Sequence, residues 1–406
     1  MQHTQQLQLP QSRDAVLGGQ TPPPVFGAVL GGLEGVKRRL HSQATIPKIA
    51  ALREALNYGE EGLKLVIEGL ASESLQVKRT AMLLLWRRPE SHVQKILAEY
   101  SQYYLFDIVD TLQSHKEAIT NLALSPNGKI LYSAGADFKI KVWNLAKDNQ
   151  ANYLGTIHGH THIVTAIALS ANGKLLVSGS RDKTVKVWDA RSGKQLLTLT
   201  GHIGYVNSVA LTPDGRTLVT GSQDTTIKLW DIRTGREIRT LRGHTSLVDS
   251  VALSPDGKLI ASCSWDTTIR VWDLLSGKLR WKFIGHSARV LSFAISPDSR
   301  TLVSGSLDTR IKVWDLQTGK SIRTLEGHWG WVKSLLISRD GKTLISASYK
   351  EMRIWSLVTG EQIQVLNGHI NLINAIALSE DGQTLVSGGE DRNIHVWGVP
   401  QLLRNF

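Results

Sequence analysis

Cysteine is almost absent from this chain of 406 residues, whose single example, Cys263, lies inside an apolar run. One thiol cannot form an internal disulfide, and it cannot supply a cluster of thiolate ligands to a metal. The sequence therefore predicts no disulfide framework. We expect Cys263 to serve as a small buried hydrophobic residue.

Long apolar runs and a secretory signal are also lacking. No stretch of about 18 uncharged apolar residues occurs, so we expect no helix that spans a membrane and no membrane insertion. The first residues, MQHTQQLQLPQSRD, lack the basic and then apolar layout of a secretory signal. These absences together predict a soluble, cytoplasmic protein.

Motifs for small-molecule chemistry are missing as well. No GxGxxG motif follows a predicted strand and precedes a helix, and the histidines lack the close spacing to a second histidine or carboxylate that metal sites use. Outside the repeats described below, no nucleophile is paired with a base. We expect no cofactor, no metal and no enzymatic activity.

Charge of one sign is not concentrated in any segment, although the net charge is +12 and the pI is about 9.7. An anionic partner, such as a nucleic acid or a charged surface, is therefore one possible interpretation. It would use the basic residues of the N-terminal part, which are Lys37, Arg38, Arg39, Arg87 and Arg88. Interleaved acidic residues make this interpretation less favoured than a protein partner.

Three regions follow one another along the chain. Residues 1–32 are rich in Gln, Pro and Gly without periodicity, which predicts a flexible leader. Residues 33–100 carry apolar stripes at helical spacing and predict a small α-helical domain. Within it, EGLKLVIEGLASESLQVKRTAMLLLWRRP resembles a HEAT-type repeat, in which paired helices stack.

From residue 101 to residue 406 the sequence repeats itself about every 42 residues. Each of seven units begins with a histidine, preceded by Gly in all but the first, and contains a later tryptophan. Between them, short alternating apolar and polar runs are separated by turn sequences such as SPDG, which predicts about four strands per unit. The histidines are His115, His160, His202, His244, His286, His328 and His369, and the tryptophans are Trp143, Trp188, Trp230, Trp272, Trp314, Trp355 and Trp397.

These units, written GHxxxV…SPDG…SGSxDxTIKVWD…TG, resemble the WD-repeat β-propellers. The resemblance implies an all-β seven-bladed propeller with four-stranded antiparallel blades, preceded by the small α-helical domain. It also implies a non-enzymatic scaffold for protein or peptide partners, acting as a monomer or as part of a larger complex.

Histidine, serine, aspartate and tryptophan recur in nearly every unit, so seven catalytic triads are an improbable interpretation. By the resemblance, these residues form a structural hydrogen-bond network within each blade. We assign its serine to positions such as Ser180, Ser222, Ser264 and Ser306, and its carboxylate to Asp182, Asp224, Asp266 and Asp308. Units one and seven have Gly135 and Gly389 at the serine position, and unit six lacks the aspartate, so we expect these blades to be less tightly held.

Large residues depart from the repeat in one sector. By the resemblance, the third residue after each repeat histidine and the residue before each turn aspartate open onto one face of the disc, where partners bind. Aromatic residues and arginine gather at and near these positions in units three to six, and they are typical of binding hot spots. The predicted protein-binding residues are Tyr205, Leu247, Trp265, Arg289, Leu307, Trp329, Trp331 and Tyr349. Packing against a neighbouring blade or the helical segment is the alternative.

The seventh unit lacks a fourth strand, because only GVPQLLRNF follows Trp397. The segment YLFDIVDTLQSH, which ends at the first repeat histidine, His115, reads like the fourth strands SIRTLEGH and EIRTLRGH. We therefore expect this N-terminal segment to complete the last blade and to close the ring.

Overall fold

The computed structural model describes residues 32–86, 88–97, 100, 102–113, 115–145 and 151–399. Nearly all of the predicted leader, residues 1–31, lies outside the described residues. Contacts divide the chain into two compact units, Met1–Leu85 and Trp86–Phe406. This division falls earlier than residue 100, where the sequence analysis separates the helical domain from the propeller.

The first unit is helical. Its helices bury apolar residues that recur at helical spacing, including Leu52, Val66 and Ala81. The packing is close at Gly69, where an added Cβ would lie 2.9 Å from a methyl group of Leu52. The elements are α1 (Gly32–Leu40), α2 (Thr45–Ala55), η1 (Leu56–Tyr58), α3 (Gly59–Glu68), η2 (Gly69–Ala71) and α4 (Leu75–Trp86).

The second unit begins with α5 (Ser91–Leu97) and η3 (Gln102–Leu105) and continues as a β-propeller. Each of the first five blades is a four-stranded antiparallel sheet of consecutive strands. Blade one has β2 (Ile119–Leu124), β3 (Ile130–Gly135), β4 (Ile140–Asn144) and β5 (Asn152–Ile157). Blade two has β6 (Val164–Leu169), β7 (Leu175–Ser180), β8 (Val185–Asp189) and β9 (Gln195–Leu199).

Blades three to five repeat this order. Blade three has β10 (Val206–Leu211), β11 (Thr217–Ser222), β12 (Ile227–Asp231) and β13 (Arg236–Leu241). Blade four has β14 (Val248–Leu253), β15 (Leu259–Ser264), β16 (Ile269–Asp273) and β17 (Leu279–Phe283). Blade five has β18 (Val290–Ile295), β19 (Thr301–Ser306), β20 (Ile311–Asp315) and β21 (Ser321–Leu325).

Blades six and seven share one long strand, β25 (Gln362–Leu378). Its first part pairs with β24 as the outer strand of blade six, and its second part pairs with β26 as the inner strand of blade seven. The two blades thus form one seven-stranded sheet. The other strands of this sheet are β22 (Ser334–Ile337), β23 (Thr343–Ala347), β24 (Tyr349–Ser356), β26 (Leu385–Gly389), β27 (Asn393–Gly398) and β1 (Asp107–Gln113).

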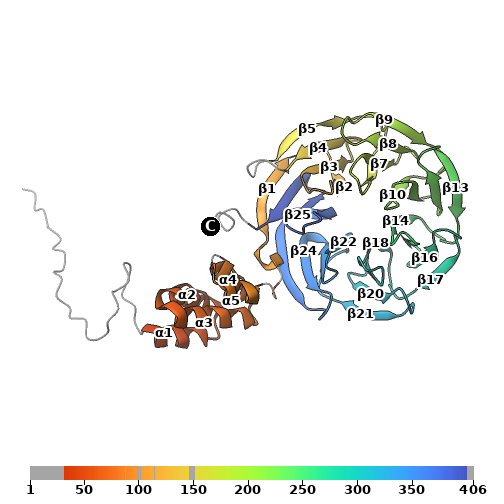
Figure 1. The fold of residues 1–406 in the computed structure, drawn as a ribbon. Helices are drawn as coiled ribbons and strands as arrows, with labels where there is room; N and C mark the ends of the chain where they lie inside the picture. Colours follow the sequence, from red (N-terminus) through yellow and green to blue (C-terminus); the bar gives the residue numbers. More distant parts are fainter. Residues whose placement is uncertain are drawn as a thin grey trace, which may run out of the picture. The chain divides into compact units, whose positions relative to one another are not determined.

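The ring closes through β1, which pairs antiparallel with β27 from Asp107↔Gly398 to Gln113↔Asn393. The predicted closure by the N-terminal segment is therefore confirmed. Figure 1 shows β1 on the rim beside the strands of the last blade. The seven-bladed fold and the helices before it are confirmed as well.

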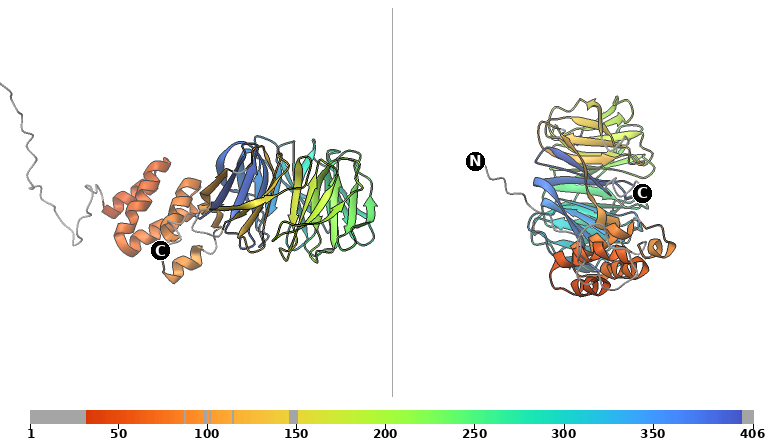
Figure 2. Two further views of the ribbon diagram at one scale, coloured as in Figure 1. Left: turned by 90° about the horizontal axis from the view of Figure 1, so that it is seen from above. Right: turned by 90° about the vertical axis from the view of Figure 1, so that its left-hand side faces the viewer.

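The first strands of neighbouring blades contact one another around the centre, and the fourth strands lie on the rim (Figure 1). Figure 2 shows the propeller edge-on, with its blades side by side. The apolar core lies between blades: Phe283 of blade four packs with Phe293 and Trp314 of blade five. Cys263 is fully buried in the same cluster, as predicted. Among the described residues, none of the helices is long and apolar enough to cross a membrane.

Candidate protein-binding face of the propeller

A polar network ties together each blade, and blade two illustrates it. His160 Nδ1 lies 2.7 Å from Asp182 Oδ2, and His160 Nε2 lies 2.7 Å from Ser178 Oγ. Trp188 Nε1 donates to the same Ser178 Oγ at 2.8 Å. One chain of donors satisfies all four groups with a neutral imidazole: Trp188 donates to Ser178, Ser178 donates to His160, and His160 donates to Asp182.

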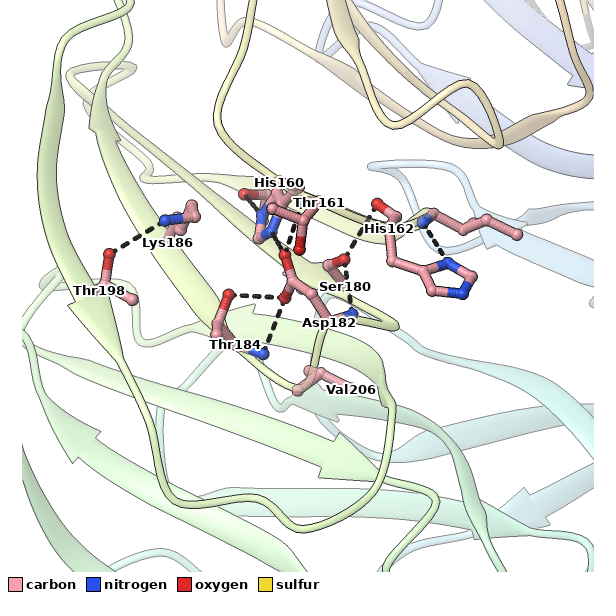
Figure 3. A network of polar contacts seen from close by, with 12 residues as sticks. His160, Thr161, His162, Ser180, Asp182, Thr184, Lys186, Thr198 and Val206 are labelled. Carbon is pink, nitrogen blue, oxygen red and sulfur yellow. Dashed lines mark hydrogen bonds and ion pairs between the residues drawn. The ribbon is translucent and has the colours of Figure 1, made fainter.

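Figure 3 shows how Asp182 gathers further donors on its carboxylate. The backbone N–H of Thr161 and the hydroxyl of Thr184 both donate to it, at 3.1 Å and 2.7 Å. Burial alone would raise the pKa of this carboxyl, but the hydrogen bonds from His160 and Thr184 outweigh burial and hold the pKa well below its usual range. The carboxylate is therefore charged and saturated with donors.

The network hydroxyl is not the one that the sequence analysis assigns. Ser180 Oγ instead accepts from the backbone N–H of Asp182 at 3.0 Å and donates to the His162 carbonyl at 3.2 Å. Residues two apart on a strand face the same side, so both hydroxyls of an SGS sequence fit the pattern. The network residues are Ser133, Ser178, Thr220, Ser262, Ser304, Ser346 and Ser387.

Blades one and seven consequently keep complete networks despite Gly135 and Gly389. His115 Nε2 lies 2.9 Å from Ser133 Oγ, and His369 Nε2 lies 2.7 Å from Ser387 Oγ. The expectation that these two blades lack the network serine was wrong, because the glycines occupy the position of Ser180 rather than that of Ser178.

Blade six replaces the missing aspartate with Glu351. Its Oε1 lies 3.1 Å from His328 Nδ1 and accepts from Arg353 Nε at 2.7 Å. The longer side chain, carried by β24, reaches the histidine from a different backbone position. The network of blade six therefore retains a carboxylate that is shared with an arginine.

The two sets of predicted face positions are neighbours within each regular blade. The backbone N–H of Trp265 donates to the Leu247 carbonyl at 3.1 Å, and that of Leu307 donates to the Arg289 carbonyl at 2.9 Å. The same bond joins Gln223 to Tyr205 at 2.8 Å. Loops before the first strands and turns after the second strands thus meet at one face of the ring.

Contacts connect several of these residues across blades four to six. The Arg289 guanidinium lies 3.7 Å from the centroid of the Trp265 ring. The N–H of Val332, directly after Trp331, donates to the carbonyl of Ser306, directly before Leu307, at 3.1 Å. A Cβ placed on Gly330 would lie 3.0 Å from the Cβ of Tyr349. We call this set the blade 4–6 arc; it comprises Trp265, Arg289, Leu307, Trp329, Trp331 and Tyr349.

The aromatic side chains of the arc lie largely outside the blade core. Trp329 is 91 % exposed, and Trp331 and Tyr349 are each 52 % exposed, whereas the repeat residue Trp355 of the same blade is 3 % exposed. Trp265 is half-buried, and its buried indole N–H has no acceptor among the described residues, so stacking by Arg289 rather than a hydrogen bond holds the ring. Leu247 and Leu307 are half-buried as well.

Tyr205 belongs to a second cluster that the sequence analysis missed. Its ring lies 6.1 Å from that of His162, and the Arg181 guanidinium lies 5.6 Å above it. Phe138, 43 % exposed, extends this cluster to blade one, 5.4 Å from His162. His162 is the second residue after the repeat histidine His160, so it directly precedes the third position, which is predicted to face a partner. This spacing could have identified His162 from the sequence.

Three of the five basic residues that a nucleic-acid interface would use are paired with acids. Lys37 Nζ lies 2.8 Å from Glu34, Arg39 pairs with Glu54, and Arg88 Nη1 lies 3.6 Å from Glu90. Arg87 lies outside the described residues. These pairs reduce the cationic surface that the nucleic-acid interpretation requires.

Blade seven brings together three potential metal ligands that the spacing rule missed. Ligand atoms of His369, Asp391 and His395 all lie within 4.8 Å of one another. Both ring nitrogens of His369 are engaged, however, by Asp391 at 2.8 Å and by Ser387 at 2.7 Å. A cation at this position would have to break the blade network, so the geometry favours a structural role.

Comparison with protein families gives a match over most of the propeller, to the model described as WD domain, G-beta repeat. The matched residues are 106–144, 151–189, 193–231, 235–273, 277–315, 319–356 and 360–398. No curated protein matches the chain. Because the family match recurs once per blade and covers more than half of the sequence, this chain belongs to the WD-repeat family of β-propellers.

Proposed function

We propose that this protein is a non-enzymatic scaffold that binds a protein or peptide partner through the blade 4–6 arc. The observation that carries the proposal is the exposure of Trp329 and Trp331, 91 % and 52 %, on the blade beside the one that carries Arg289 of the Trp265–Arg289 pair. Tryptophan, tyrosine and arginine dominate binding hot spots, and adjacent exposed aromatic residues are unusual on a surface that meets only water. WD repeats generally mediate contacts between proteins.

Leu247 and Tyr205 complete the proposed surface at its blade three and blade four edge. Leu247 is joined to Trp265 through the backbone, and Tyr205 adds a ring and a hydroxyl from the neighbouring cluster. A partner that spans both clusters would cover blades one to six. We propose that the arc supplies most of the binding energy and that Tyr205 lies at the edge of the binding surface.

Selection from a display library of random peptides tests this proposal. The full-length protein is the bait, and the double variant Trp329→Ala, Trp331→Ala is the comparison. We expect selected peptides to lose about 30-fold or more in affinity for the double variant, since a central aromatic anchor contributes about 2 kcal/mol or more. Ile203→Ala, which removes an exposed apolar side chain from blade three, is the matched control.

Stability must be measured on the same variants. We expect Trp331→Ala to change the free energy of unfolding by no more than about 0.5 to 1 kcal/mol, because little core is removed. A loss of about 3 to 5 kcal/mol would instead identify the ring as part of the packing between blades. Failure to select any peptide whose binding depends on Trp329 and Trp331 would contradict the proposed function.

A nucleic acid or another polyanion is the less supported partner, because acids pair with Lys37, Arg39 and Arg88, three of the five basic residues that it would use. Such binding would weaken steeply with added salt. We also propose that the helical unit is HEAT-like and that the protein acts in the cytoplasm. The latter fits a chain whose only cysteine is buried and unpaired.

A further inference from the structure

Two cationic side chains lie over aromatic rings at opposite ends of the blade 4–6 arc. The Arg289 guanidinium covers Trp265 at 3.7 Å from the ring centroid, and Lys350 Nζ lies 5.1 Å from the centroid of Tyr349. The loop of Trp329 and Trp331 lies between them, because Val332 bonds to blade five on one side and, on the other, a Cβ on Gly330 would lie only 3.0 Å from that of Tyr349. An exposed apolar platform is thus flanked by two positive charges.

The charges of this sector are unequally compensated. Glu326 lies 3.1 Å from Arg310 Nε, and Glu351 pairs with Arg353. The carboxylate of Asp308 stays charged but is buried behind its hydrogen bond from His286. Arg289 and Lys350 make no ion pair with any residue that the structure describes. The unpaired charges that exposed side chains offer beside the tryptophans are therefore those of Arg289 and Lys350.

Stacking on Trp265 holds the Arg289 guanidinium in an orientation that suits the binding of a carboxylate. A guanidinium that lies over an aromatic ring turns its face to the ring and keeps its N–H donors at the edge, where they can bind both oxygens of one carboxylate. The ring also reduces the freedom that the side chain would lose on binding. Lys350 offers a point charge, which accepts a carboxylate from a wider range of directions.

We propose that the partner segment of the blade 4–6 arc is an acidic peptide. An apolar or aromatic side chain of the peptide lies on Trp329 and Trp331, and carboxylates on either side of it bind Arg289 and Lys350. This inference rests on the proposed function and specifies its ligand. A carboxylate is favoured over a phosphate because the two cations come from separate blades, whereas phosphate sites bring several cations to one point.

The test uses the peptides selected from the random library on the full-length protein. We expect Asp and Glu to be enriched next to Leu, Phe, Tyr or Trp in every peptide family that depends on Trp329 and Trp331. Replacing these acids with Asn and Gln should weaken binding about tenfold or more, as measured by fluorescence anisotropy.

Charge-neutral variants locate the effect on the protein. Lys350→Gln should weaken the acidic peptides about five- to tenfold and should leave the affinity of the Asn/Gln peptides unchanged. Arg289→Gln also removes the stacking on Trp265, so it should weaken the acidic peptides more than the Asn/Gln peptides. Arg181→Gln is the matched control, because Arg181 lies over Tyr205 on the same face but outside the arc. Lys350→Gln leaves the Trp265 stacking intact, so the test does not depend on the Arg289 variant alone.

The outcomes separate this inference from the proposed function. Peptides that depend on Trp329 and Trp331 but are neutral or basic would overturn the inference and leave the proposed function standing. Binding that becomes more than about tenfold tighter when phosphoserine replaces Glu would overturn it in favour of phosphopeptides. If no peptide depends on the two tryptophans, both proposals fail.

Discussion

One hydroxyl in each blade serves two neighbours at once. In blade three, Thr220 Oγ1 lies 2.8 Å from His202 Nε2 and accepts from Trp230 Nε1 at 2.9 Å. Both partners are buried, so neither can turn to water if the hydroxyl is lost. The hydroxyl therefore fixes the histidine, and through it the carboxylate that closes the turn.

Replacing Thr220 with Val keeps the shape of the side chain and removes its hydrogen bonds. We expect a loss of about 2 to 4 kcal/mol in the free energy of unfolding, because two buried polar atoms lose their partner. The matched control is Ser222→Ala, which removes one bond to the backbone N–H of Asp224 and should cost only about 1 kcal/mol. Denaturant unfolding measures both, and equal losses would contradict the assignment of Thr220 to the network.

The sequence could identify the residue types of the network but not the hydroxyl within it. Ser178 and Ser180 both lie on β7 and face the same side, and only the position of the Trp188 indole on the neighbouring strand distinguishes them. The same limit applies to the candidate site. The resemblance to the WD repeats implied one face for Trp265 and Arg289, but their stacking depends on side-chain rotamers that no repeat pattern encodes.

At the scale of elements, blade six shows how a short unit is accommodated. Its turn is shortened, so β24 begins at Tyr349 immediately after Ser348, and Tyr349 pairs with Leu372 of β25. Between blades six and seven, the residues that form a loop between other neighbouring blades are therefore part of the continuous strand β25. The sequence showed the missing residue, but the merged sheet could not be predicted because it depends on pairing between blades.

The other unusual element is β1, which supplies the outer strand of blade seven. Thr111 Oγ1 lies 2.9 Å from His395 Nδ1, so a side-chain bond supports the backbone pairing. The turn pattern of the repeats made this closure predictable, because one unit lacked a strand and a matching strand preceded the first unit.

Deleting residues 103–112 should expose β27 and open the ring. We expect aggregated or rapidly proteolysed protein, because an unpaired strand edge and the apolar surface beneath it would meet solvent. Size-exclusion chromatography and limited proteolysis measure the result, with a deletion of equal length at residues 11–20 as the control. A soluble deletion product with one cooperative thermal transition would show that β1 does not close the ring.

For the whole molecule, the buried titratable groups predict a stability that falls in two stages as pH decreases. Burial, together with the neighbouring His369, lowers the pKa of His395 to about 4. Unfolded histidine titrates near pH 6.5, so between about pH 6.5 and 4 only the unfolded state gains this proton, at a cost of up to about 3 kcal/mol. Thermal melts across this range measure the first stage. His395→Gln should reduce it, and burial of His328, which also lowers the pKa of that imidazole, accounts for the remainder.

The second stage begins below about pH 4. Burial raises the pKa of Asp308, but hydrogen bonds from His286 and the backbone outweigh it and lower the pKa to about 2. Its stabilising effect is therefore complete above the unfolded value near 4 and is lost as pH falls towards 2. A profile of His395→Gln that keeps the full loss between pH 6.5 and 4 would contradict the assignment of the first stage.

Closure by β1 also determines how the ring would respond to tension. Asp107, the first residue of β1, pairs with Gly398, the last residue of β27, so the chain enters and leaves the seam at the same end of the ladder. A pull between these two ends loads the hydrogen bonds one after another, as in opening a zipper, rather than all at once. The propeller should therefore resist a partner that presses on its face, yet open at low force when its two chain ends are drawn apart.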